Sequence, residues 1–191
     1  MKRRKFLTQL ASASATASMI SAKSAQGAES SDGFRIGACD WTMKKATQPE
    51  AIALAKRIGL DGVEVDVGQP KRESDPLPLS DKALQKQYLE ASKRLEIAIP
   101  SLAMGVLNKI PYKSSNGAER WAEEAISICQ SMDVSMVLMA FFGAGDLAED
   151  AKGRDEVVER LKKLAPKAED AGVTFGIESW LHADVLMAML E

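Results

Sequence analysis

A carboxylate at the end of a short apolar run near the C-terminus is the residue best placed for chemistry. Residues 171–180 read AGVTFGIESW, in which Gly172 would end a helix and a buried strand would follow. Glu178 stands at the end of that strand. In parallel α/β proteins, ligands bind and reactions take place at the carboxyl ends of the strands. Glu178 is therefore the strongest candidate for a site residue, and a solvated glutamate at a strand end is the alternative.

The elements that must position this residue alternate regularly along the chain. Short apolar runs typical of strands begin near Phe34, Gly62, Glu96, Ser135 and Val173. The segments between them carry apolar residues at helical spacing. No low-complexity linker follows residue 33, so residues 31–191 are predicted to form one α/β domain.

Local signals mark the ends of several helices. Thr47 and Glu50 have the spacing of a capping box, and Gly59 is typical of the residue that follows a helix. Asn116 marks the start of a later helix. The last long helix is expected to run from about Arg154 to Gly172. These boundaries predict five βα units in succession.

Two architectures contain five successive βα units: a five-stranded doubly wound sheet, and part of an eight-stranded (β/α) barrel. The length favours the doubly wound sheet. However, no glycine-rich phosphate loop follows the first strand, and the final helical pattern stops at Glu191 without a capping residue or a return strand. We therefore predict a (β/α) barrel truncated after about five βα units, with its strands in the order 1-2-3-4-5.

The first 30 residues have the features of an export signal rather than of a fold. KRRKFL at residues 2–7 resembles the start of a twin-arginine (Tat) signal, and AQG at 25–27 offers a cleavage site. The sequence thus predicts Tat export to the periplasm or another extracytoplasmic space, with no stable membrane anchor. The whole chain carries a net charge of −2, and the remainder without this basic segment is acidic. An acidic domain has no general attraction to nucleic acid.

Three segments carry a family resemblance. IGACDW at 36–41, GLDGVEV at 59–65 and LAPKAEDAGVTFGIE at 164–178 resemble strand one, strand two, and the fourth helix with the fifth strand of xylose isomerase-like TIM barrels. That family contains sugar isomerases and epimerases. The resemblance extends over residues 34–191.

The resemblance implies metal-dependent proton transfer on a sugar or sugar phosphate, through an enediol-type intermediate. It implies that Glu178 is both a metal ligand and a catalytic acid or base, and that the cofactor is a divalent ion such as Mn, Mg, Co or Zn. Strand alternation agrees, since Gly176, Glu178 and Trp180 would share one face while Phe175 and Ile177 face the helices. A homo-oligomer is compatible with this assignment.

The further candidates for substrate binding are Trp41, Glu64 and His182. Trp41 could form an apolar wall against a sugar ring, or it could pack at the rim. Glu64 and Asp66 would share the inner face of strand two, where a structural hydrogen bond is as good an explanation as substrate contact. His182 lies close to Glu178, although a role at a helix terminus is the stronger interpretation.

The remaining metal ligands of the family come from strands six to eight, which the sequence does not contain. We therefore expect an incomplete barrel, and two other functions stay open. One is a non-catalytic, truncated remnant that binds a sugar or a protein partner. The other is an AP endonuclease-like hydrolase, which the export signal and the acidic domain disfavour.

Overall fold

The computed structural model describes residues 33–190, so the expected export signal at residues 1–30 lies outside the described residues. The strands are β1 (Gly37–Cys39), β2 (Gly62–Asp66), β3 (Leu102–Met104), β4 (Met136–Phe141) and β5 (Thr174–Ser179). The α-helices are α2 (Glu50–Ile58), α3 (Lys82–Leu95), α4 (Asn116–Met132), α5 (Ala151–Asp170) and α6 (Ala183–Leu190). Short 3₁₀ turns lie at Pro78–Ser80, Gly105–Asn108 and Gly143–Gly145.

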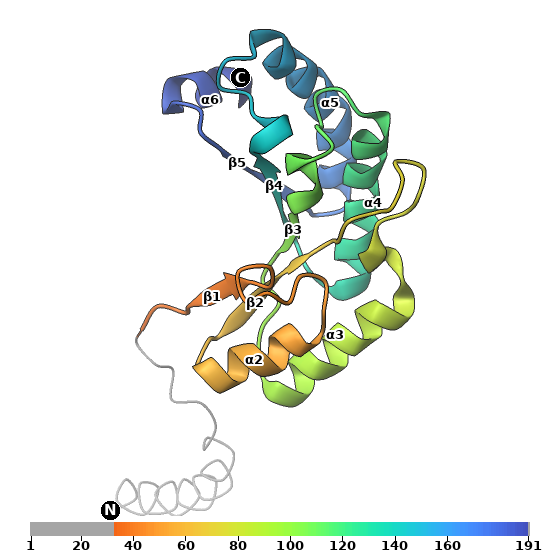
Figure 1. The fold of residues 1–191 in the computed structure, drawn as a ribbon, viewed down its shortest axis with the longest axis vertical. Coiled ribbons are helices and arrows are strands. Elements are labelled where there is room, and N and C mark those ends of the chain that lie inside the picture. The colour runs from red at the N-terminus through yellow and green to blue at the C-terminus, as the bar shows by residue number, and fades with distance from the viewer. Residues whose placement is uncertain (1–32, 191) are drawn as a thin grey trace, which may run out of the picture. The chain divides into compact units, whose positions relative to one another are not determined.

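The five strands form one parallel sheet in the order β1-β2-β3-β4-β5. A helix joins each strand to the next, as the colour gradient in Figure 1 shows. The sequential order confirms the barrel-type prediction over a doubly wound sheet, in which the strand order would be 2-1-3-4-5. Parallel sequential strands bring all five carboxyl ends to the same edge of the sheet.

The predicted capping box of α2 is wrong. Thr47 has a left-handed backbone with φ 55°, and the side chain of Pro49, which precedes the helix, makes no capping hydrogen bond. The amide of Thr47 donates to Asp40 Oδ2 at 2.9 Å, and its hydroxyl donates to the carbonyl oxygen of Asp66 at 3.2 Å. Contacts with neighbouring strands therefore take the groups that a local cap would have used. The end of α2 at Gly59, with φ 82°, is as predicted.

The other long helices begin with side-chain caps. Asp81 accepts a hydrogen bond from the amide of Ala83 at the start of α3, and Ser115 accepts from Ala118 at the start of α4. α5 begins at Ala151, a turn earlier than the predicted Arg154, because Asp150 caps it through the amide of Gly153. Each capped helix begins on the loop that leaves the carboxyl end of a strand.

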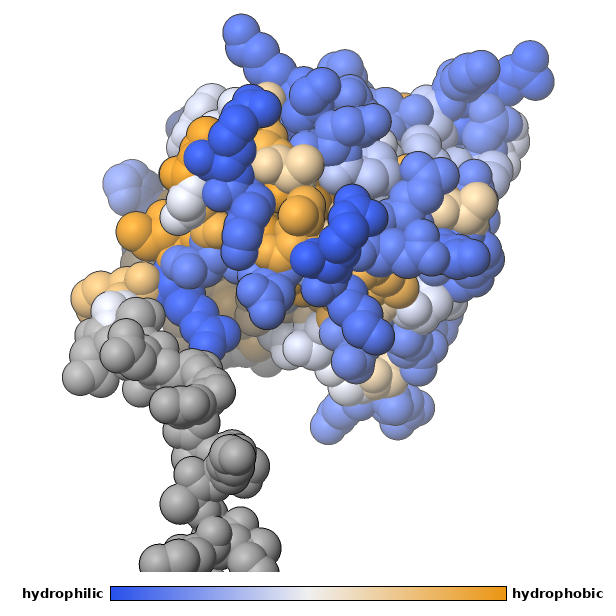
Figure 2. All heavy atoms as spheres, turned by 90° about the horizontal axis from the view of Figure 1, so that it is seen from below, coloured by the Kyte–Doolittle hydropathy of each residue, from blue (hydrophilic) through white to orange (hydrophobic). Residues whose placement is uncertain are grey.

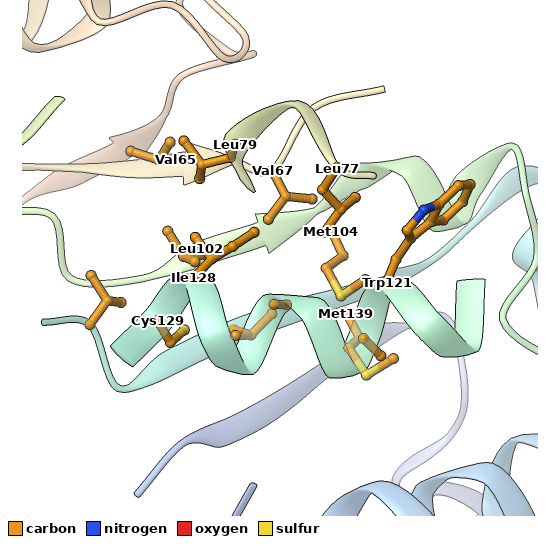
Figure 3. Packing of buried hydrophobic residues seen from close by; sticks show 14 of the residues in the cluster. Val65, Val67, Leu77, Leu79, Leu102, Met104, Trp121, Ile128, Cys129 and Met139 are labelled. Atoms are coloured by element: carbon orange, nitrogen blue, oxygen red, sulfur yellow. The ribbon is translucent and has the colours of Figure 1, made fainter. Parts of the chain in front are cut away.

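The hydrophobic core lies between the sheet and the helices. Alternate residues of the strands point into it, and Figure 3 shows how they pack against α4 and the segment before α3. The buried residues that it labels are Val65, Val67, Leu77, Leu79, Leu102, Met104, Trp121, Ile128, Cys129 and Met139. Because side chains alternate along a strand, the residues between these core residues lie on the other face of the sheet.

The outer surface of the described residues is mostly polar. Figure 2 shows one face on which hydrophilic residues surround a smaller apolar area. Within residues 33–190, no helix is both long enough and apolar enough to cross a membrane.

Candidate functional site

The inner face of the sheet carries the residues that the helical core does not use. In β2, Val63 and Val65 belong to the core, so Glu64 and Asp66 point to the opposite face. The same alternation places Ala103 and Ala140 on the inner face, since both are buried but neither belongs to the core cluster. The inner face therefore combines carboxylates with small residues.

Glu178 lies on this inner face at the carboxyl end of β5. Phe175 and Ile177 pack against the core on the helix side, and alternation turns Gly176 and Glu178 the other way. Glu178 is exposed and is paired in register with Ala140 of β4. Its carboxylate therefore lies at the edge formed by the carboxyl ends of the strands, with the small residue Ala140 beside it.

Trp41 lies on the same edge, in the loop after β1. Its half-buried ring packs over Gly105, where an added methyl group would lie 2.8 Å from Trp41 Cζ3. Gly105 directly follows β3, and the register of Met104 with Met139 places it beside Ala140. Neighbouring strands are about 4.8 Å apart, so roughly 10 Å separates β3 from β5. Gly105 thus accommodates the ring of Trp41, and the small Ala140 lies between that ring and Glu178.

Glu64 is held by a cross-strand hydrogen bond. The hydroxyl of Ser101, which precedes β3, donates to Glu64 Oε2 at 2.7 Å. The carboxylate is half-buried and keeps its second oxygen for another donor. The bond to Ser101 shows that Glu64 has a structural partner, which fits either of the interpretations left open by the sequence.

His182 lies directly before α6, whose first residue is Ala183. Its side chain is exposed, and its backbone carbonyl accepts a hydrogen bond from the amide of Leu186 at 3.0 Å, within the first turn of α6. Among residues 33–190, no hydrogen bond or ion pair links its ring to another side chain. The structure brings Trp41, Glu64 and Glu178 to one face and edge of the sheet, and leaves His182 at a helix start.

Asp66 is a buried carboxyl group at this edge, and within residues 33–190 one of its oxygens has no hydrogen bond. The residue is 4% exposed, and its Oδ1 has no hydrogen-bond partner among the described residues. Burial, together with the charge of nearby Asp40, raises the pKa of Asp66 to about 6. Asp66 Oδ1 lies 3.5 Å from the point where a Cβ of Gly105 would stand, next to the ring of Trp41. The carboxylate of Asp66 and the ring of Trp41 therefore both lie next to Gly105.

The buried charge of Asp66 should make folding pH-dependent. A carboxyl whose pKa is higher in the folded state than in the unfolded state, where it is about 3.9, stabilises the fold only while it is protonated. That contribution is complete below pH 4 and is lost as the pH rises through about 6. We expect the free energy of unfolding of the wild type to fall by about 2–3 kcal/mol, relative to that of Asp66→Asn, between pH 4 and pH 7.5.

Urea denaturation at several pH values measures this difference. Asp155→Asn is the matched control, because Asp155 is an exposed aspartate on α5 and its replacement should leave the pH dependence of the wild type unchanged. Parallel pH curves for the wild type and Asp66→Asn would contradict the placement of a buried, ionisable carboxyl at this position.

Sequence reasoning missed two contacts that shape the site. Asp40 is completely buried and binds Tyr88 of α3. At the other end of the edge, the ring of Phe142 packs against that of Trp180, with 5.1 Å between the ring centroids. The position of Asp40 directly after a strand was the sequence signal that could have indicated its contact with Tyr88. No sequence signal pairs Phe142 with Trp180, because they follow different strands.

The described residues do not form a metal site. Within residues 33–190, no three or more His, Cys, Asp or Glu side chains are grouped so that they could hold a metal ion. The hydrogen-bonded Oδ2 of Asp40 faces N–H and O–H donors rather than open space, and Glu178 stands apart. Because a single carboxylate does not bind a divalent ion usefully by itself, this part of the chain does not fit the ion that the resemblance implies.

The fold and the polar edge of its sheet define a protein built from (β/α) barrel units. The chain belongs to the xylose isomerase-like TIM barrel family, whose model matches residues 52–187. This confirms the resemblance predicted from the sequence. No curated protein matches the chain.

Several solved structures share the fold. A xylose isomerase-like TIM barrel protein from Mycobacterium smegmatis, in complex with magnesium, superposes with a TM-score of 0.64 at 14% identity, covering 82% of this chain and 60% of that one. A D-psicose 3-epimerase from Clostridium cellulolyticum H10 with D-tagatose gives 0.60 at 15% identity, covering 82% and 60%. A D-allulose 3-epimerase from Methylomonas sp. with D-allulose gives 0.58 at 16%, covering 82% and 58%. The chain therefore spans about 60% of the length of these structures.

Proposed function

We propose that this protein acts on a sugar as an isomerase or epimerase, with the substrate lying beside Ala140, between Trp41 and Glu178. The observation that supports the proposal most strongly is the meeting of an aromatic ring, small residues and a free carboxylate at one edge of the sheet. The two epimerase structures named above contain D-allulose and D-tagatose, which supports a ketose or related sugar as the ligand class.

Each part of the edge suits one part of such a ligand. An aromatic face packs against the C–H groups of a sugar ring. Gly105 makes room for the ring of Trp41, and the small side chain of Ala140 occupies little of the space next to it. Glu64, fixed by Ser101, offers an acceptor for a sugar hydroxyl. A half-buried carboxylate with one oxygen not hydrogen-bonded is a strong acceptor because fewer water molecules compete for it than at the surface.

Glu178 is the proposed acid or base. A proton on a carbon next to a carbonyl group is acidic enough for a positioned carboxylate to remove. The electron pair of the C–H bond then forms a C=C double bond, and the π electrons of the carbonyl group move to its oxygen, which gives an enediolate. The carboxylic acid can return the proton to the same carbon or to its neighbour. Return to the neighbouring carbon, with the hydroxyl proton of the first carbon passing to the enediolate oxygen, is isomerisation. Epimerisation needs a proton from the opposite face of the sugar, which a second acid such as a water molecule must supply because Glu178 reaches one face.

Two finer statements belong to the same proposal. Glu178 would also be the residue that this chain offers to a divalent metal ion, as the resemblance implies. The first 30 residues would direct Tat export. Both rest on the sequence patterns described above.

Binding of D-allulose tests the proposed position of the sugar. Replacing Trp41 with alanine removes the apolar wall, and we expect the dissociation constant for D-allulose, measured by calorimetric titration, to rise about tenfold, equivalent to about 1.4 kcal/mol. Leu89→Ala is the control, because Leu89 is a partly exposed apolar residue on α3. Equal affinities of the wild type and Trp41→Ala would contradict the proposed site.

A further inference from the structure

The loop that carries Trp41 is built around one buried carboxylate. Asp40 is 0% exposed, and its Oδ2 accepts three hydrogen bonds from three parts of the chain. The donors are the amide of Thr47 at 2.9 Å, the amide of Asp66 at 3.2 Å and the hydroxyl of Tyr88 at 3.2 Å. A buried carboxylate without such donors would be costly, so Asp40 is bound to a defined position between β2, α3 and its own loop.

These bonds determine the shape of residues 40–49, here called the Trp41 loop. The carbonyl oxygen of Asp40 accepts the amides of Met43 and Lys45, which closes a tight turn around Trp41. Lys44 and Thr47 both have left-handed backbones, with φ 57° and 55°. Non-glycine residues adopt this conformation at a free-energy cost, and surrounding contacts must maintain it. For Thr47, those contacts are its bonds to Asp40 and Asp66.

Trp41 directly follows Asp40, so its position depends on this turn. Gly105 lies so close to the ring that a methyl group there would be 2.8 Å from Cζ3. The ring is therefore confined between a backbone without a side chain and a loop whose conformation is set by the hydrogen bonds of Asp40. Asp40 itself is fully buried and therefore cannot contact a ligand directly.

We propose that Asp40 is a positioning residue, which acts with Tyr88 to hold Trp41 over Gly105 as the apolar wall of the sugar site. The role in sugar binding rests on the function proposed above. The placement of Trp41 does not, because it follows from the hydrogen bonds alone. Tyr88 belongs to the inference because it is a side-chain donor from a different βα unit. It ties the Trp41 loop to α3.

The chain offers a matched pair of variants to test this. Tyr88→Phe removes one hydroxyl, which bonds to Asp40. Tyr112→Phe also removes a single hydroxyl group from a fully buried tyrosine. The hydroxyl of Tyr112 has no hydrogen-bond partner among the described residues. Asp40→Asn is a third variant, which weakens the acceptor while keeping its size. A role limited to general stability would not change the surroundings of Trp41 in a folded variant.

Fluorine NMR of the 191-residue chain labelled with 5-fluorotryptophan reports on its three tryptophans, and Trp41→Phe assigns the signal of Trp41. We expect Tyr88→Phe and Asp40→Asn to shift or broaden the Trp41 resonance, and Tyr112→Phe to leave it unchanged. A Trp41 resonance that stays unchanged in Tyr88→Phe would overturn the proposal, even if Asp40→Asn did not fold.

Titration with D-allulose separates this inference from the proposed function. If the wild type binds D-allulose, we expect Tyr88→Phe to raise the dissociation constant about three- to tenfold and Tyr112→Phe to leave it unchanged. A shifted Trp41 resonance in a chain that binds no sugar would support the placement of Trp41 by Asp40 and overturn the sugar-binding proposal. Unaltered sugar affinity in Tyr88→Phe, despite a shifted resonance, would overturn the role of Asp40 in the sugar site.

Discussion

Replacing Glu178 with glutamine is expected to slow proton exchange on a bound sugar by roughly 10²–10⁴-fold, the contribution of a positioned acid or base. The amide has nearly the same size and cannot accept the proton. Glu178 is exposed at the end of β5, so the fold should not depend on its charge. The measurement is the rate at which D-allulose takes up deuterium from D₂O, followed by proton NMR.

Glu169→Gln is the control for this prediction. Glu169 is an exposed glutamate of α5 and lies beside Phe175 and Ile177, on the helix side of the sheet. The same chemical change there should leave the exchange rate within about twofold of the wild type, because surface changes away from a site have small effects. Equal deuterium-uptake rates for Glu178→Gln and the wild type would contradict the proposed role of Glu178 as the acid or base.

Replacing Trp121 with alanine is expected to lower the free energy of unfolding by about 3–5 kcal/mol, the usual cost of deleting a large buried aromatic side chain. Trp121 is 0% exposed in the core between α4 and the sheet. Its indole Nε1 also donates to the carbonyl oxygen of Asp75 at 2.9 Å, which ties the segment before α3 to α4. Urea denaturation followed by circular dichroism measures the loss.

Trp180→Ala serves as the comparison. The Trp180 side chain is 68% exposed and packs mainly on the ring of Phe142, so we expect a loss of about 1 kcal/mol or less. Similar losses for the two variants would mean that the packing around Trp121 in Figure 3 does not carry the stability of the core.

The sequence was sufficient to predict the sheet and its two faces. Repeated βα units without a phosphate loop predicted the sequential strand order that the structure has. Because side chains alternate along a strand, the apolar Phe175 and Ile177 also indicated which face of β5 packs against the helices. Both predictions rest on periodic patterns, which depend little on distant parts of the chain.

Other features depend on residues far apart in the sequence and were missed or wrong. The capping box of α2 failed because Thr47 binds Asp40 and Asp66 instead, and this requires strands β1 and β2 to lie side by side. The bond between Asp40 and Tyr88 joins residues 48 positions apart. The start of α5 is a local exception: it was placed too late because the apolar periodicity begins only after the Asp150 cap.

A titration of the isotope-labelled chain with D-allulose, followed through its backbone amide signals, tests the proposed site most directly. If the sugar lies between Trp41 and Glu178, the signals of Gly105, Ala140 and Glu178 should shift together and saturate with one dissociation constant. The signals of Leu164 and Ala168, which lie in α5 on the opposite side of the sheet, should stay in place. Shifts confined to α5, or no shift at any of these residues, would contradict a sugar site at this edge of the sheet.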